Sequence, residues 1–355
     1  MLKKWSITML FMVLLLSLAA CSGSGEKAEA DGKSNVIEAD IEGASYILPG
    51  KEDGVSEGDK KSGILEVNLK IKNVSKSSIT LSAFDGGVKF YDGDEQLKPK
   101  DHIVNSTLDL TPDIPSGDIG PGKVQKMIFF FDVEKDKEYK IGLKPSFNDS
   151  SKKTNEVLLN LDTKKYADSF NALKDPEKAL IAYIDTIYLD KDNADYEKYV
   201  TADKAALQEE AQKAFRHEVK EVVGDTISDI EIDKHYPTFK SILSQKAKLK
   251  ATTSGFANGK AIVKLDYSSV SLENLYDKVY KYKRDYRDKT GNYDFDKTDQ
   301  YALSKLDLVL NSLEIDSNKN PVDVKMVQKD GKWTVDRTDD FSDSLVRTFA
   351  KGYIY

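Results

Sequence analysis

The hydrophobic period of this chain changes from two to that of helices close to Asp162, and this change limits the folds that the chain can adopt. Before it, apolar and polar side chains alternate, most regularly over residues 65–71. Alternation of this kind indicates strands with one buried face. After it, apolar side chains recur every three to four residues, as they do in amphipathic helices. The sequence therefore predicts two domains, an all-β domain over residues 36–162 and an α+β domain over residues 166–355.

Turn signals separate the short strands that are predicted in the first half. Further strands are expected at residues 79–81, 89–91, 95–97, 127–131, 139–143 and 157–161. The dipeptide Asp92-Gly93 predicts a hairpin between two of them, because both residue types tolerate a positive φ. Short strands at a spacing of roughly ten residues, with turns between them, are typical of a β-sandwich.

Six segments of the first half follow one another in the same order as in a known family of domains. They are residues 65–73, 81–84, 90–97, 120–123, 129–133 and 139–143. These segments resemble the telokin-like, immunoglobulin-like domain of unknown function that many Gram-positive lipoproteins carry. The resemblance implies an immunoglobulin-like sandwich on the cell surface. It brings no catalytic motif with it.

The second half begins with a strong helix signal at Asp175-Pro176-Glu177. This tripeptide offers a capping side chain, a proline in the first turn and an acid near the positive end of the helix dipole. Further helices are expected over residues 203–223, near 239–243, from 271 onwards, over 299–313 and around 341–349. Strands are expected over residues 247–253, 260–267, 322–327 and 332–335.

Two segments of the second half resemble other lipoproteins. Residues 179–184 are similar to the opening helix of small lipoprotein domains of unknown function, and residues 324–335 are similar to their ending. That ending also resembles the cone-shaped fold of nuclear-transport-factor-two-like and cystatin-like domains. The resemblance implies helices packed on a curved antiparallel sheet. The helices within residues 271–313 exceed what a plain cone requires.

The start of the chain predicts where the protein acts. Two lysines precede an apolar run over residues 5–18, and two alanines then precede Cys21. A basic start, a short apolar region and small residues before a cleavage site define a secretory signal. The apolar run is shorter than the roughly 20 residues that a membrane-spanning helix needs.

The motif Leu-Ala-Ala-Cys that ends at Cys21 resembles the lipobox of bacterial lipoproteins. The resemblance implies a signal peptide of residues 1–20, cleavage between Ala20 and Cys21, and acyl chains such as palmitate on the cysteine. Residues 21–35 then form a lipidated cysteine and a flexible tether, because no large apolar side chain follows the cysteine there. We expect the protein on the extracytoplasmic face of the cell membrane. Five arginines among 53 basic residues suggest a low-G+C Gram-positive source.

Composition argues against several functions. A formal net charge of −7 does not favour nucleic acid or anionic lipid headgroups as partners. Because Cys21 is the single cysteine, we expect no disulfide, no cysteine-ligated metal and no thiol nucleophile. The histidines lack the spacing of a zinc-binding helix, and neither a Gly-x-Ser-x-Gly elbow nor a phosphate-binding glycine loop occurs. The sequence thus predicts no enzyme, no cofactor and no metal.

One acidic segment comes closest to a calcium loop. Asn292, Asp294 and Asp296 match positions 1, 3 and 5 of an EF-hand. However, Lys297 stands where the loop needs a glycine, and Leu303 stands where it needs a bidentate glutamate. We therefore predict a solvated loop that caps the next helix.

Tyrosines and basic residues gather over residues 276–293. Tyr276, Tyr280 and Tyr286 could form a ligand site together with Trp333 of the closing hairpin. Aromatic rings among cations are able to bind nucleic acid or glycan. In the other interpretation, most of these tyrosines form the buried stripe of one helix and the lysines form its solvated face.

Three functions fit the sequence. The favoured one is a membrane-anchored extracytoplasmic lipoprotein that binds a protein or another envelope partner and has no catalytic activity. In the alternative, the second domain is a carrier or sensor that encloses a small apolar ligand in its cone, lined by residues such as Tyr276, Tyr280, Trp333 and Phe341. The third is a cell-wall-active hydrolase, which would need converging carboxylates about 5–9 Å apart.

Overall fold

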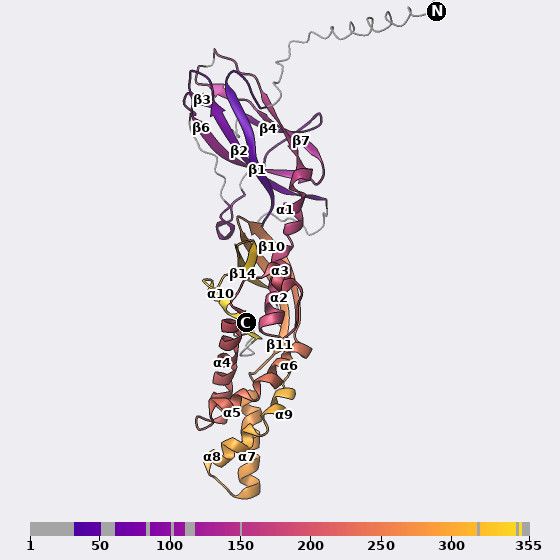
Figure 1. The fold of residues 1–355 in the computed structure, drawn as a ribbon, viewed down its shortest axis with the longest axis vertical. Coiled ribbons are helices and arrows are strands. Elements are labelled where there is room, and N and C mark those ends of the chain that lie inside the picture. Colours follow the sequence, from indigo (N-terminus) through magenta and orange to yellow (C-terminus); the bar gives the residue numbers. More distant parts are fainter. Residues whose placement is uncertain are drawn as a thin grey trace, which may run out of the picture.

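The computed structural model describes residues 32–50, 61–82, 86–100, 103–110, 118–149, 151–317, 320–345 and 348–349. The predicted signal peptide, the cleavage site between Ala20 and Cys21 and most of the tether lie outside these residues. Figure 1 shows an elongated molecule, with the strands of the first half at one end and helices of the second half reaching the other. Across the described ranges, no helix combines the length and the apolar character that crossing a membrane requires.

The first half consists of antiparallel strands. Its elements are β1 (Ile37–Pro49), β2 (Ser62–Asn73), β3 (Ile79–Thr80), β4 (Val88–Asp92), β5 (Glu95–Leu97), the 3₁₀ turn η2 (Ser106–Leu108), β6 (Val124–Glu134), β7 (Glu138–Leu143), β8 (Ser146–Phe147) and β9 (Val157–Asp162). Strands β1, β2 and β6 lie side by side, and β5, β4, β7 and β9 form a separate four-stranded sheet. The predicted hairpin at Asp92-Gly93 is confirmed, since Asp92 of β4 pairs with Glu95 of β5.

One apolar core fills the space between these two layers. Val67 and Leu69 of β2 are fully buried in it, as the alternation of residues 65–71 predicts. Phe131 of β6 stacks on Phe90 of β4, with 4.3 Å between the ring centroids. Such contacts between rings of facing layers fix how the two sheets pack.

The sequence pattern does not predict strand β1, because a β-bulge interrupts its alternation. Its pairing with β2 shifts between Ile41 and Gly43. A shift of one residue moves the following side chains to the opposite face of the sheet. After the bulge, the consecutive residues Tyr46 and Ile47 are both buried, one against each face.

The second half packs helices on an antiparallel sheet. Its elements are η3 (Thr163–Tyr166), α1 (Ala167–Ala172), α2 (Asp175–Ile187), α3 (Asp195–Tyr199), α4 (Lys204–Val223), α5 (Asp229–Asp233), α6 (Tyr236–Lys246), β10 (Lys248–Ala257), β11 (Lys260–Val270), α7 (Leu275–Thr290), α8 (Phe295–Leu303), α9 (Leu306–Asn311), β12 (Ile315–Ser317), β13 (Val322–Lys329), β14 (Lys332–Val335) and α10 (Asp340–Asp343). The sheet order is β14-β13-β11-β10, and β12 pairs with the end of β11. Leu180 and Ile184 of α2 share a core with Val263 and Leu265 of β11. The predicted antiparallel sheet with packed helices is confirmed.

Helix α2 forms where the sequence predicts it, but its first turn differs in one respect. The N-cap residue is Lys174, whose backbone already lies in the right-handed helical region. Asp175 lies inside the helix, and its carboxylate accepts a hydrogen bond from Nζ of Lys178 at 3.0 Å. The predicted capping by Asp175 is therefore wrong, because the chain arrives from α1 in a helical conformation. Pro176 lies in the first turn as predicted.

The single helix predicted over residues 299–313 is also wrong, because the chain forms α8 and α9 there. The backbone N–H of Lys305 donates to the carbonyl of Ala302, three residues back. This tighter turn ends α8 and redirects the chain. The helix expected from residue 271 begins later, since α7 starts at Leu275.

The two halves meet within one continuous sheet. Leu48 and Pro49 at the end of β1 pair with Phe256 and Gly255 of β10. The side chain of Phe256 packs against the apolar cores of both halves. The strand order across the junction is β14-β13-β11-β10-β1-β2-β6. Backbone pairing and a shared side chain therefore connect the β-rich half to the half that carries the helices.

Candidate functional site

A polar groove of about 700 Å³ lies between α4 and α6, and we call it the α4–α6 groove. Its lining residues are Asp190, Ala205, Gln208, Glu209, Gln212, Tyr236, Pro237, Lys240, Ser241, Ser244 and Gln245. Among these described residues, no side chain is a large aliphatic one. The groove therefore offers mainly hydrogen-bonding groups, with one aromatic ring.

The apolar stripes of the two helices hold the walls of the groove in place. Ala211 and Phe215 of α4 are buried in the core, and Phe215 stacks on Phe239 of α6 with 4.9 Å between the ring centroids. Gln208 and Gln212 are four residues apart and therefore lie on the same side of α4. The pattern that buries the stripe of α4 thus places these two glutamines beside it, at the groove.

Several polar groups of the groove are engaged with one another or with its surroundings. Lys240 donates from Nζ to Oδ1 of Asp190 at 2.8 Å. Gln208 donates from Nε2 to the carbonyl of Thr186 in α2 at 3.2 Å. Glu209 pairs with Lys213 on the same helix at 2.6 Å, and Lys213 lowers the pKa of this carboxyl. The charged groups at the groove are therefore matched by partners in the protein.

Polar side chains on both walls remain available to a ligand. Gln212 and Ser244 line the groove from opposite helices, and both are half-buried. Neither side chain makes a hydrogen bond with another described residue. An amide and a hydroxyl can each donate and accept. Each wall of the groove thus carries a free hydrogen-bonding group.

Tyr236 supplies the aromatic ring of the groove. Its ring centroid lies 5.3 Å from that of Phe215, and Nζ of Lys240 lies 5.8 Å from its ring centroid. Burial, with a further contribution from the charge of Asp190, raises the pKa of Tyr236. Its hydroxyl therefore stays protonated at physiological pH and can donate a hydrogen bond.

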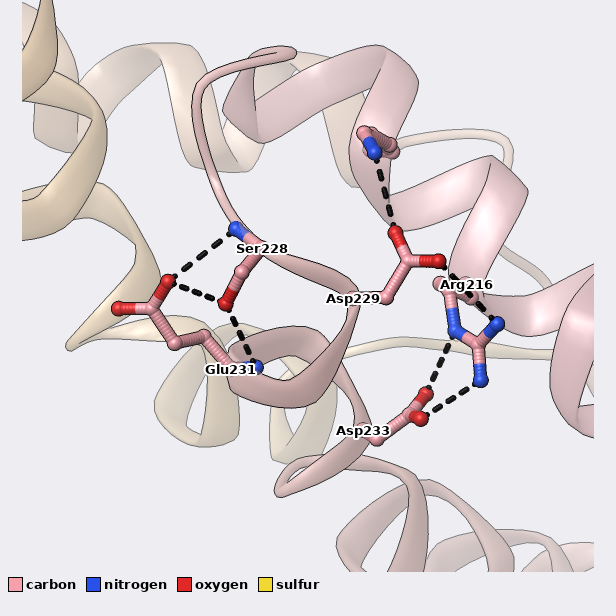
Figure 2. A network of polar contacts seen from close by, with 6 residues as sticks. Arg216, Ser228, Asp229, Glu231 and Asp233 are labelled. Atoms are coloured by element: carbon pink, nitrogen blue, oxygen red, sulfur yellow. Dashed lines mark hydrogen bonds and ion pairs between the residues drawn. The ribbon is translucent and has the colours of Figure 1, made fainter.

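A network of ion pairs joins α5 to α4, beyond the Tyr236 end of the groove. Figure 2 shows Arg216 of α4 reaching both Asp229 and Asp233 of α5. Arg216 binds Asp233 through two hydrogen bonds, from Nε at 2.9 Å and from Nη2 at 2.6 Å. Its third contact, from Nη1 to Asp229, is 3.3 Å long. Paired bonds of this kind are strong and strongly directional.

A capping box completes the same segment. The hydroxyl of Ser228 accepts a hydrogen bond from the N–H of Glu231, and the Glu231 carboxylate accepts one from the N–H of Ser228 (Figure 2). Bonding to Ser228, and then to Gln300, lowers the pKa of Glu231. Because α5 connects α4 with α6, these contacts fix the two walls of the groove relative to each other.

The predicted ligand residues lie in three different places. Tyr276 and Tyr280 come together on α7, where their rings stack with 5.9 Å between centroids and an interplanar angle of 9°. Tyr286, further along α7, packs instead against Tyr301 at 5.0 Å. Trp333 is buried in the core on β14. Figure 1 places β14 near the middle of the molecule and α7 at its far end, so the structure does not bring Trp333 to the tyrosines.

The expectation that the tyrosines of α7 form a buried stripe is wrong for Tyr276 and Tyr280, whereas Tyr282 does pack against the core. Leu275 and Val279 occupy the buried positions of the helix. Tyr276 and Tyr280 each follow one residue later and are 56% and 43% exposed. One residue along a helix is a rotation of about 100°, which takes both rings away from the core. The side chain of Phe341 lies outside the described part of the chain.

The acidic segment before α8 caps the N-terminus of this helix, as predicted. Asp294 is the N-cap of α8 and accepts a hydrogen bond from the N–H of Lys297. Asn292 accepts one from the N–H of Asp294. In the described ranges, no group of three or more histidine, cysteine, aspartate or glutamate side chains is placed to hold a metal ion.

No motif in the sequence singles out the α4–α6 groove. Glutamine and serine are ordinary residues of solvated helix faces, and their spacing alone does not distinguish a groove from a surface. The available signal is that Gln208 and Gln212 directly follow the apolar residues Leu207 and Ala211. This placement predicts that both amides lie at the edge of the apolar stripe. It does not predict which helix lies opposite them, because that depends on the tertiary structure.

Known proteins resemble this chain at two levels: a family model matches the half that contains the groove, and one relative matches nearly the whole chain. The family model described as "Domain of unknown function (DUF5105)" matches residues 166–350. The chain is 28% identical over 359 residues to the uncharacterized lipoprotein YcdA of Bacillus subtilis (strain 168), covering 98% of this chain and 99% of the relative. The crystal structure of YcdA matches with a TM-score of 0.67 at 25% identity, covering 91% of this chain and 99% of YcdA.

Proposed function

This chain belongs to the DUF5105 family, and we propose that it is a lipid-anchored protein of the extracytoplasmic membrane face that acts by binding a partner of the cell envelope. It is similar along nearly its whole length to YcdA, which is described as an uncharacterized lipoprotein. The likeness supports a membrane-associated lipoprotein. The lipobox motif that ends at Cys21 supports the position of the lipid.

The α4–α6 groove is the observation that carries the binding function. It has a volume of about 700 Å³, and Gln212 and Ser244 line it from opposite walls with side chains that make no hydrogen bond to another described residue. The Arg216–Asp233 contact holds the end of these walls in place before any partner arrives. A preformed groove loses less conformational entropy on binding. Its polar lining favours a polar partner over a small apolar ligand.

We propose no catalytic role for the groove. The pairing with Lys213 lowers the pKa of Glu209, which makes this carboxyl a poor proton donor at neutral pH. Asp190 is bound to Lys240. Both carboxylates are therefore employed in ion pairs, whereas a glycoside hydrolase needs one carboxyl that stays protonated and a second that faces it.

The proposal also assigns a role to each half of the chain. We propose that residues 36–162 form an immunoglobulin-like spacer next to the membrane and that residues 166–355 form the binding module, with a cone of the nuclear-transport-factor-two-like type enlarged by α7 to α9. Two layers around a single core support the first part. The start of the family match at residue 166 supports the boundary.

The anchor is tested in the source organism with Cys21→Ala. We expect loss of incorporated radioactive palmitate, together with release of the protein or accumulation of the uncleaved precursor. Cleaved protein that stays in the membrane without acyl chains would contradict the lipid anchor.

The binding site is tested by photo-crosslinking in intact cells. A benzoylphenylalanine at Ala205, on the exposed rim of the groove, should yield a discrete adduct, and a second change, Gln212→Leu, should reduce it. The same probe at Gln328, which is exposed on β13, is the control. Equal adducts from both positions, or an adduct from Ala205 that Gln212→Leu leaves unchanged, would show that the groove is not the binding site.

A further inference from the structure

The charges around the α4–α6 groove argue against a strongly charged ligand. Nζ of Lys240 lies 2.8 Å from Asp190, and Nζ of Lys213 lies 2.6 Å from Glu209. A polyanion or a cation that entered the groove would have to break one of these pairs to find a counter-charge. The groups that remain free, Gln212 among them, are neutral.

The free groups match hydroxyls and amides. The side-chain amide of Gln212 and the hydroxyl of Ser244 each offer a donor and an acceptor. Gln245, which donates to Oγ of Ser241 at 3.1 Å, still has an amide oxygen available at the rim. A row of groups that both donate and accept is complementary to the hydroxyls of a sugar, which do the same.

Tyr236 and Pro237 add flat apolar surface at the start of α6. Tyr236 is half-buried, because its ring packs on Phe215 and Nζ of Lys240 lies over it, whereas Pro237 is exposed. A pyranose ring has an apolar C–H face and a polar rim, so it can lie against Pro237 and the edge of the Tyr236 ring while its hydroxyls reach the neighbouring amides. Most small-molecule sites are lined mainly by apolar and aromatic side chains, so a lining in which polar groups outnumber the apolar ones suits a ligand that is itself covered with hydroxyls.

The groove lacks the features of two common modes of peptide binding. In these modes the peptide uses an open sheet edge, or apolar pockets for the side chains of a docked helix. The walls here are two helices, and the described lining has no large aliphatic residue. From Ala205 to Gln212 the wall of α4 is about 10 Å long at 1.5 Å per residue, which suits a short stretch of oligosaccharide.

From these contacts we infer that the α4–α6 groove binds a neutral glycan, with Gln212 and Ser244 on its hydroxyl or acetamido groups and with Pro237 and the edge of the Tyr236 ring against the face of one sugar ring. This inference rests on the proposed function, which makes the groove the binding site. It adds the chemical class of the ligand.

The test uses the mature lipidated protein in phospholipid nanodiscs and three neutral probes, namely tetramers of N-acetylglucosamine, of β-1,4-linked glucose and of α-1,4-linked glucose. Binding is measured by isothermal titration calorimetry and by native mass spectrometry. At least one tetramer should bind, and Gln212→Leu and Ser244→Ala should each weaken it about tenfold, as expected when one hydrogen-bonded partner is removed. Gln328→Leu, the same change on an exposed strand, should leave the affinity unchanged.

Each other outcome decides against one of the two claims. If none of the tetramers binds, while the Ala205 photo-probe still captures a partner that Gln212→Leu releases, the glycan inference is wrong and the groove remains a binding site for another class, such as a peptide. If a tetramer binds with equal affinity to the Gln212→Leu, Ser244→Ala and Gln328→Leu variants, the sugar binds elsewhere and the inference is wrong. If neither tetramers nor a cellular partner depend on Gln212, the proposed function fails as well.

Discussion

Nζ of Lys283 lies 2.8 Å from Oδ1 of Asp299, and the two side chains are only 17% and 11% exposed. Lys283 is on α7 and Asp299 is on α8, while Nζ of Lys283 also donates to the carbonyl of Val223 at 2.9 Å. Val223 is the last residue of α4, where free carbonyls and the negative end of the helix dipole favour a cation. One ammonium group thus joins three helices.

The first prediction concerns this ammonium group. Lys283→Met should lower the free energy of unfolding by about 3 kcal/mol, because it leaves Asp299 as a mostly buried, unpaired carboxylate. Urea denaturation followed by circular dichroism measures the change. Lys213→Met is the matched control, since its partner Glu209 lies on the surface and the pair should contribute little. Equal midpoints for the two variants would show that the Lys283 pair contributes no more than a surface pair.

The second prediction concerns Gly224, which follows α4. Its φ of +120° lies in the region that favours glycine, and a Cβ there would meet the Asp299 carboxylate. Gly224→Ala should therefore lower the free energy of unfolding by about 2 kcal/mol or more, because backbone strain and the clash add together. Gly291→Ala is the control, with a φ of +65° and open space around the new methyl group. It should cost only about 1 kcal/mol.

If Gly224→Ala lowered the free energy of unfolding less than Gly291→Ala does, the Asp299 carboxylate would have to move aside at no cost in free energy. Thermal unfolding followed by circular dichroism is sufficient to rank the two variants, because both replace a glycine that follows a helix by the same residue.

The third prediction is a dependence on pH. Glu66 of β2 is buried, and burial raises its pKa, while a hydrogen bond from Asn68 opposes the shift. The native state therefore favours the protonated form more than the unfolded chain does. The ionised carboxylate weakens the fold above both pKa values, and this penalty disappears as the pH falls towards the ordinary value of 4.5.

Glu66→Gln should accordingly raise the free energy of unfolding at neutral pH and make little difference at about pH 4, where glutamate is protonated in both states. Denaturant titrations at both pH values measure the difference. Glu138→Gln, an exposed position on β7, should change stability little at either pH. A stabilisation by Glu66→Gln that is the same at both pH values would exclude burial of the charge as its cause.

The spacing of apolar residues predicts many of the strands and helices, because an element that buries one face needs apolar side chains at regular intervals. The alternation over residues 65–71 and the stripe of α4 both follow from burial of every second, or every third to fourth, side chain. Strand β1 lacks such a pattern because its bulge at Ile41 and Gly43 changes the buried face midway. Its pairing with β10 involves only two residue pairs, which no periodicity can mark.

The candidate groove is harder to predict for a different reason. Gln212 and Ser244 belong to helices that are separated in sequence, and each is an ordinary polar residue beside an apolar stripe. Their approach depends on the Phe215–Phe239 stack between α4 and α6, which is a tertiary contact. Conversely, the aromatic and basic cluster on α7 stands out in the sequence. Its residue Tyr276 is turned to solvent because Leu275 takes the buried position.

The last prediction concerns the junction between the two halves. Phe256 of β10 pairs through its backbone with Leu48 of β1, and its side chain packs against both apolar cores, with its ring centroid 5.5 Å from that of Trp333. Phe256→Ala should lower the free energy of unfolding by about 2 kcal/mol, since the ring is half-buried. It should also make the two halves unfold separately, so that scanning calorimetry resolves two transitions where the unmodified protein shows one.

The control is Phe147→Ala, because Phe147 is half-buried against the first core alone. This variant should destabilise the protein without splitting the transition. A single transition for Phe256→Ala, or the same splitting for Phe147→Ala, would show that Phe256 does not couple the two cores.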